Sequence, residues 1–263
     1  SSLIQLIPMK EYKKQGRKAK KVWEAIEGFI FPKLKDVYTV NRSIAELYDK
    51  KYKKNVKIVR NISPLWQPQN ILSKEELGLP TDKPILIVQG AGINIDRGAE
   101  EAVEAMQQID GAYLIFVGDG DVIQSLKERV IQLNIAEKVL FYGKKPYDLL
   151  LQYTYHSSIG LTLDKDTNLN YKYSLPNKVF DYIHTNTPIV ATNLIEVRQI
   201  VEGNNVGVIL EDFTEQNLVN AINALLNNPS QLKVLSDNCK QAKFQLSWEG
   251  EEEVLRKIYT PYL

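Results

Sequence analysis

The sequence predicts an α/β protein built on a doubly wound parallel sheet. From residue 84 onward, short apolar runs alternate with longer amphipathic segments. The runs are continuously apolar, as in ILIV and LIFV, which is typical of strands buried on both faces. Each run is followed by a helical pattern, and this order produces parallel strands joined by crossover helices.

The first 72 residues predict a smaller strand and helix unit. Apolar residues at helical spacing favour a helix over 17–31 that ends at Pro32. A strand over 36–41, a helix from the N-cap Ser43 to Tyr52 and a strand over 56–61 follow. We interpret 62–72 as a linker, because it contains two prolines and no clear period.

The region 73–246 is expected to form one domain. It opens with a short capped helix over 73–80 that Gly78 and Pro80 end. The predicted strands then cover 84–90, 112–118, 138–143, 158–163, 188–192 and 206–211. The helices between and after them cover 98–109, 121–134, 146–156, 177–185, 196–203 and 214–228. Residues 247–263 form a final amphipathic segment.

Composition favours an ordinary globular protein of the cytoplasm. The chain has 263 residues, of which 44% are hydrophobic and 25% charged. No apolar run approaches the roughly 20 residues of a membrane span, and the first residues do not have the pattern of a secretory signal. The single cysteine, Cys239, excludes an internal disulfide and a cysteine-based metal site.

Charge is distributed unevenly along the chain. Residues 1–60 carry 16 lysines and arginines against 6 acidic residues, whereas the rest carries 17 against 26. The densest basic stretch, from Lys10 to Lys21, predicts either a solvated helix face or contact with an anionic membrane surface. We expect no nucleic-acid partner.

The run YSLPNKVFDYIHTNTP, residues 173–188, is the strongest candidate site. Pro176 and Asn177 mark a helix start, so unpaired backbone N–H groups and the positive end of the helix dipole lie there. Lys178 adds a full positive charge, which suits a phosphate. Asp181, one turn further on, can accept hydrogen bonds from sugar hydroxyls. The pattern therefore indicates a nucleotide or a nucleotide-sugar.

Three more loops follow predicted strands, where open parallel sheets bind ligands. The first runs from Gly90 to Gly98 and contains Arg97, which can pair with a diphosphate, although its glycines do not have dinucleotide-binding spacing. The second contains Gly118 and Gly120, with Asp119 or Asp121 as a helix cap, and the third contains Gly143 and Lys144. Each also fits a simple turn.

The sequence offers little support for a metal site or for general acid–base catalysis. Asp164 and Asp166 form a pair, but no histidine or further carboxylate has metal-ligand spacing with them. His156 and His184 lie on predicted helices without an acid or nucleophile beside them. We expect no metal and no cofactor.

The order of these motifs resembles the retaining glycosyltransferases of the GT-B fold, group 1 or family 4. The resemblance covers roughly residues 36–259 and is carried by TVNRSIAELY with VRN, ILIVQGAGINIDRG, LIFVGDGD, KVLFYG, SLPNKVFDYIHTNTPIVAT and GVILED. It implies two Rossmann-like domains that face a cleft, with 73–246 holding the nucleotide-sugar donor. It also implies that residues 1–72 are the tail of an acceptor domain whose earlier strands precede residue 1, and that 247–263 cross back to it.

The resemblance also implies roles for individual residues. Asp181 matches the second acid of a Glu-seven-residues-Glu motif, which binds the donor ribose. Arg97 with Gly98 matches a pair that neutralises the diphosphate, and Gly143 with Lys144 matches the base-binding loop. The donor site would thus comprise Arg97, Lys178, Gly90, Gly98, Gly118, Gly120, Gly143, Lys144, Tyr173, Ser174, Leu175, Pro176, Asn177 and Asp181.

Two positions depart from the family pattern. Tyr173 replaces the first acid of the motif, and Ala91 replaces an arginine. A different donor, compensation by Asp164 or Asp166, and lost activity are the readings that remain open. The function expected is transfer of a sugar to a glycan or lipid-linked acceptor in polysaccharide biosynthesis, in the cytoplasm or at the inner membrane face. Its alternatives are nucleotide-sugar binding alone, sugar-nucleotide epimerisation and dinucleotide oxidoreduction.

Overall fold

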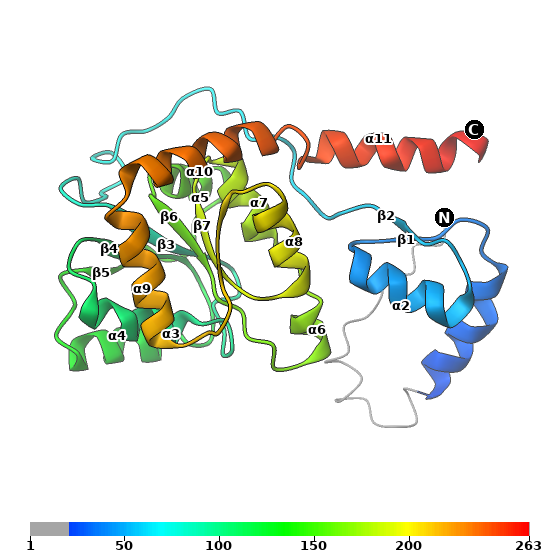
Figure 1. Ribbon diagram of the computed structural model, residues 1–263, viewed down its shortest axis with the longest axis horizontal. Helices are drawn as coiled ribbons and strands as arrows, with labels where there is room; N and C mark the ends of the chain where they lie inside the picture. The colour runs from blue at the N-terminus through cyan, green and yellow to red at the C-terminus, as the bar shows by residue number, and fades with distance from the viewer. Residues whose placement is uncertain (1–20, 263) are drawn as a thin grey trace.

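The computed structural model describes residues 21–262 (Figure 1). The basic stretch singled out in the sequence lies outside the described residues except for Lys21. Two sheets are present in the described part, a small one near the amino end and a large one that follows.

The large sheet has six parallel strands in the order β5-β4-β3-β6-β7-β8. The chain builds outward from β3 to β5, returns to the middle at β6 and builds outward again to β8. This is the predicted doubly wound arrangement, and β3 and β6 flank its switch point. The strands are β3 (Ile85–Gly90), β4 (Tyr113–Gly118), β5 (Val139–Phe141), β6 (Ile159–Thr162), β7 (Ile189–Thr192) and β8 (Gly207–Leu210).

Helices cover both faces of this sheet (Figure 1). Successive residues of β4 show why its sequence is continuously apolar: Leu114 and Phe116 enter the core on one face, while Ile115 and Val117 enter the core on the other. One core includes α3 (Ala99–Ala105), α4 (Ile123–Gln132) and α9 (Glu215–Leu226). The other includes α5 (Tyr147–Tyr155), α7 (Asn177–His184), α8 (Ile195–Gly203) and α10 (Pro229–Ala242).

The small unit pairs β1 (Tyr38–Thr39) with β2 (Lys57–Ile58) in parallel, and both strands are shorter than predicted. A helix over 21–30, η1 (Phe31–Lys33) and α2 (Arg42–Tyr52) accompany them. The N-cap of α2 is Asn41 and not Ser43, because the Asn41 side chain accepts a hydrogen bond from the Ile44 amide at 3.0 Å.

Two other local predictions were wrong or incomplete. The capped helix over 73–80 is only a turn: Ser73 and Glu76 exchange capping hydrogen bonds, but Gly78 adopts a left-handed φ of 66° and Pro80 follows. Conversely, the loop before α7 contains the short helix α6 (Leu169–Lys172), which the sequence did not predict. A 3-10 turn, η2 (Met106–Gln108), ends α3.

The last helix, α11 (Trp248–Tyr259), extends from the large unit toward the small one and ends in η3 (Thr260–Tyr262) (Figure 1). The buried carboxylate of Glu251 accepts hydrogen bonds from the backbone N–H of Arg60 at 2.7 Å and from its guanidinium at 2.9 Å. The hydroxyl of Tyr262 donates to Asp36 at 2.5 Å. The carboxyl end of the chain therefore ties the two units together.

Candidate functional site

The loops that follow β3 and β6 meet at the switch point of the large sheet. Arg97 ends the loop after β3, and Asp164 comes two residues after β6. A crevice between such loops is where open α/β sheets bind ligands. The fold therefore places a charged pair where a ligand is expected.

Asp164 is the centre of a buried ionic cluster with Arg97 and Lys178. Its Oδ1 lies 2.5 Å from Nη1 of Arg97, its Oδ2 lies 3.4 Å from Nζ of Lys178, and its side chain is 0% exposed. The ring of Tyr171 stacks under the Arg97 guanidinium at 4.5 Å. Since two cations share one carboxylate, the cluster keeps one net positive charge.

The amino end of α7 lies beside this cluster. The helix begins at Asn177 after Pro176, as the proline pattern predicted, and no side chain caps it in the described structure. Lys178 belongs to its first turn and is 13% exposed. Of the four residues from Leu175 to Lys178, only Pro176 has no N–H to offer. Backbone donors and a lysine therefore converge where an anion is stabilised.

The side chain of Asp181 is buried beneath the protein surface. It is 5% exposed, Gln89 donates to its Oδ2 at 2.9 Å, and Tyr147 donates to its Oδ1 at 2.7 Å. Burial raises the pKa of Asp181 to about 6, although both hydrogen bonds oppose this rise. Burial also raises the pKa of Tyr147, so its hydroxyl keeps its proton.

Glycines shape the ends of β3, β4 and β5. At Gly118 φ is 152° and a Cβ atom would stand 1.9 Å from the carbonyl oxygen of Gly90, so only glycine fits. The N–H of Gly118 donates to the carbonyl of Gly143 at 2.9 Å, which joins three strand ends. Gly98 is also required, because a Cβ there would lie 2.3 Å from Cβ of Leu163. Gly120 packs against the loop after β3, and Lys144 is exposed.

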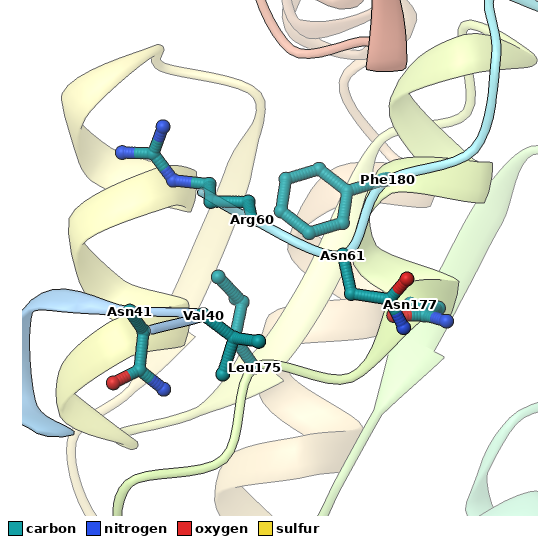
Figure 2. A pocket seen from close by; sticks show the side chains of 7 residues that line it. All are labelled: Val40, Asn41, Arg60, Asn61, Leu175, Asn177 and Phe180. Atoms are coloured by element: carbon teal, nitrogen blue, oxygen red, sulfur yellow. The ribbon is translucent and has the colours of Figure 1, made fainter. Parts of the chain in front are cut away.

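The start of α2 contacts the large unit at two places, one of them in the 173–177 loop. The side chain of Asn41 donates to the carbonyl of Tyr173 at 2.8 Å, and buried Glu196 accepts from the amide of Ser43 at 2.7 Å. A pocket of about 160 Å³ lies at this junction. Figure 2 shows its lining by Val40, Asn41, Arg60, Asn61, Leu175, Asn177 and Phe180.

The structure brings some of the candidate residues together and leaves others apart. Arg97 and Lys178 meet at Asp164, whereas Asp181 faces Gln89 and Tyr147. Neither Asp119 nor Asp121 caps α4, contrary to prediction, because their carboxylates accept from the amides of Gly120 and Ile95 instead.

Both histidines have structural roles. Nε2 of His156 lies 2.6 Å from the carbonyl of Leu72, and Nε2 of buried His184 lies 2.7 Å from the carbonyl of Leu246. Burial lowers the pKa of His184 and favours its neutral form. Within residues 21–262, no three His, Cys, Asp or Glu side chains are grouped closely enough to hold a metal ion.

Two residues of the site escaped the sequence reasoning. Gln89 carried a signal, since it is a polar residue inside an apolar strand and such residues are buried only when hydrogen-bonded. Tyr147 carried none, because it opens an ordinary amphipathic helix 34 residues before Asp181.

Comparison with known proteins identifies the family. The family described as glycosyl transferases group 1 matches residues 70–242, which is more than half of the chain. The chain belongs to the group 1 glycosyltransferases. Its GT-B type architecture agrees with this assignment.

The curated relatives of this chain are distant and longer. An uncharacterised glycosyltransferase of Haemophilus influenzae is 26% identical over 209 residues, which are 78% of this chain and 55% of the relative. An alpha-D-kanosaminyltransferase of Streptomyces kanamyceticus is 21% identical over 68% of this chain and 46% of its own length. The chain thus spans about half the length of the curated relatives it matches.

Solved structures share the fold of this chain. Sucrose-phosphate synthase of Thermosynechococcus elongatus superposes with a TM-score of 0.75 at 19% identity, over 96% of this chain and 65% of that one. HepE of Anabaena, solved in complex with UDP-glucose, has a TM-score of 0.68 at 15% identity, over 84% and 64%.

Proposed function

We propose that this glycosyltransferase moves a sugar from a nucleoside diphosphate sugar to an acceptor hydroxyl, with retention at the anomeric carbon as in family 4. The observation that carries the proposal is the cluster of Arg97 and Lys178 around Asp164, beside the uncapped amino end of α7. Its net positive charge and its backbone donors suit a diphosphate. Bound UDP and UDP-glucose in solved structures of the same fold support this choice of donor.

In the proposed reaction, negative charge develops on the diphosphate as it leaves the sugar. The bond between the anomeric carbon and the diphosphate oxygen breaks, a bond to the acceptor oxygen forms, and the acceptor proton passes to the departing diphosphate or to solvent. Negative charge grows on the leaving group, so Arg97, Lys178 and the α7 amides lower the barrier electrostatically. Asp181 would bind the ribose, and Gly143 with Lys144 would border the base. No residue is assigned as a general base.

A thermal-shift panel of UDP, GDP, ADP and their glucose conjugates tests this proposal. A ligand at 100 times its Kd adds about 2.7 kcal/mol to the free energy of unfolding, so the melting temperature rises. Lys178→Ala and Arg97→Ala are expected to abolish the rise given by the best ligand. Lys233→Ala is the control, because Lys233 pairs with Asp237 on its own helix and is 74% exposed. A full rise in both site variants would refute the assigned site.

Nucleotide-sugar binding without transfer is the second candidate function. Tyr173 in place of an acid favours it, and Asp164 does not supply the acid, since it is enclosed and paired with two cations. The chain spans 55% of the first curated relative's length, and the resemblance to the family implies a complete acceptor domain, which transfer is proposed to need. Diphosphate release from the donor, compared between this chain and one that carries a complete first domain, separates the candidates.

Contact with an anionic membrane is proposed for the helix over 21–30. No helix of the described residues is long and apolar enough to cross a bilayer. However, this helix exposes Val22, Trp23, Ile26 and Phe29 next to the basic stretch from Lys10 to Lys21.

Vesicle sedimentation tests the membrane contact. Joint replacement of Trp23 and Phe29 by alanine is expected to lower the fraction bound to vesicles that contain phosphatidylserine by at least about threefold, because buried apolar area contributes to interfacial binding. Val234→Ala on α10 removes an apolar side chain whose exposed fraction lies between those of Trp23 and Phe29, and it serves as the control. Equal binding of all three proteins would contradict the proposal.

A further inference from the structure

The hydroxyl of Tyr147 joins three parts of the molecule. It lies 2.7 Å from Oδ1 of Asp181 on α7 and 2.9 Å from Oγ of Ser63, in the segment that connects the two units. Ser63 is tied further, because its carbonyl accepts from the amide of Trp248 at the start of α11. The hydroxyl of Tyr147 thus connects Asp181, the residue proposed to bind the ribose, with the segment that joins the two units.

The protons of this bridge can be assigned from its chemistry. A phenol has one proton and an ionised carboxylate only accepts, so Tyr147 donates to Asp181. Ser63 must then donate to the phenol oxygen. An O–H group on a buried carboxylate is a strong, charge-assisted contact. Asp181 therefore has a hydroxyl donor on Oδ1 before any ligand is present.

The two donors to Asp181 differ in how firmly they are held. Gln89 is 3% exposed, and its amide oxygen accepts a hydrogen bond from the buried hydroxyl of Thr154, so it is fixed. Tyr147 is 44% exposed and is the first residue of α5, just after the Gly143 loop. Gln89 is thus the permanent donor, and Tyr147 is the replaceable one.

We propose that Tyr147 occupies the hydroxyl-binding position of Asp181 in the free protein and that a donor ribose hydroxyl displaces it. The exchange keeps the hydrogen bond on Oδ1, since one O–H replaces another. It also frees Ser63 from Tyr147, so donor binding loosens the contact between α5 and the connecting segment. This inference rests on the proposed function of the site.

Calorimetric titration with UDP, or with GDP or ADP where one of these binds more tightly, tests the exchange. Tyr147→Phe removes the competing hydroxyl but keeps the ring, so affinity is expected to rise about three- to tenfold. The rise should vanish with either the 2′-deoxy or the 3′-deoxy diphosphate, namely the one that lacks the displacing hydroxyl. Tyr113→Phe is the matched control, because that hydroxyl bonds the exposed Asp82.

A second variant tests the hydrogen bond between Tyr147 and Ser63 of the connecting segment. Ser63→Ala is expected to raise affinity about twofold in the wild-type background and to have no effect in the Tyr147→Phe background, because the two changes act through one contact. Unchanged or weaker binding by Tyr147→Phe, with melting temperature near that of wild type, would overturn the inference alone. Failure of the wild type to bind any of the three diphosphates would overturn the proposed function and this inference with it.

Discussion

Asp181→Asn is expected to stabilise the free protein at pH 7 by about 1–3 kcal/mol while lowering diphosphate affinity at least about tenfold. The carboxylate is 5% exposed and its folded pKa is about 6, so at pH 7 it is ionised at a cost in stability. Asparagine removes the charge at nearly the same volume. The gain and the loss are expected together, because the carboxylate proposed to bind the ribose is buried at a cost to the free energy of unfolding.

The sign of the pH dependence follows from the same pKa. The folded protein holds a proton on Asp181 up to about pH 6, whereas the unfolded chain releases it near the ordinary value of 3.8. Below 3.8 the stabilising contribution of this group is complete. As pH rises through 6 the contribution is lost, so the free energy of unfolding falls between about pH 4 and 6 on its account.

Urea unfolding at several pH values measures both effects. The difference between Asp181→Asn and wild type should grow from pH 4 to pH 7. Asp212→Asn is the control for removing a carboxylate from the surface, since Asp212 is exposed and its substitution is expected to change the free energy of unfolding little. An Asp181→Asn protein that is less stable than wild type at pH 7 would contradict the burial argument.

Asp164→Ala is expected to destabilise the protein by about 3–5 kcal/mol. The substitution leaves Arg97 and Lys178 without their shared carboxylate, and their side chains are only 28% and 13% exposed. Two like charges would then face each other in a site that excludes much of the water. Asp164→Asn keeps the volume and is expected to cost less.

If the cluster of Arg97, Lys178 and Asp164 binds a diphosphate, its variants should respond to UDP, whereas variants of a purely structural ion pair should not. UDP should restore more stability to Asp164→Asn than it adds to wild type, because the diphosphate supplies the missing negative charge. Asp166→Ala is the control, since Asp166 is 52% exposed and lies 3.9 Å from its lysine partner. Equal destabilisation by the alanine substitutions at 164 and 166 would refute a buried cluster.

Local patterns in the sequence were sufficient for the sheet and for the start of α7. Continuous apolar runs predicted strands covered on both faces, and Pro176 with Asn177 predicted where the helix begins. Such features depend on neighbours within a few residues. Capping was less well predicted, since Asn41 caps α2 in place of Ser43 and such polar residues differ little in local preference. The turn at 73–80 never becomes a helix because Gly78 and Pro80 end it.

What the sequence by itself determined is the alternation of strands and helices, and with it the α/β class and the loops where chemistry is expected. Only the tertiary structure decided how those loops meet. Asp164 lies 67 residues from Arg97, and Gln89 lies 92 residues from Asp181. Such partners are brought together by the strand order of the sheet. That order depends on the burial of apolar residues throughout the core, so no periodic pattern in the sequence reveals it. For that reason Lys178 was predictable as a charge at a helix end, while the carboxylate that holds it, and the tyrosine that covers Asp181, were not.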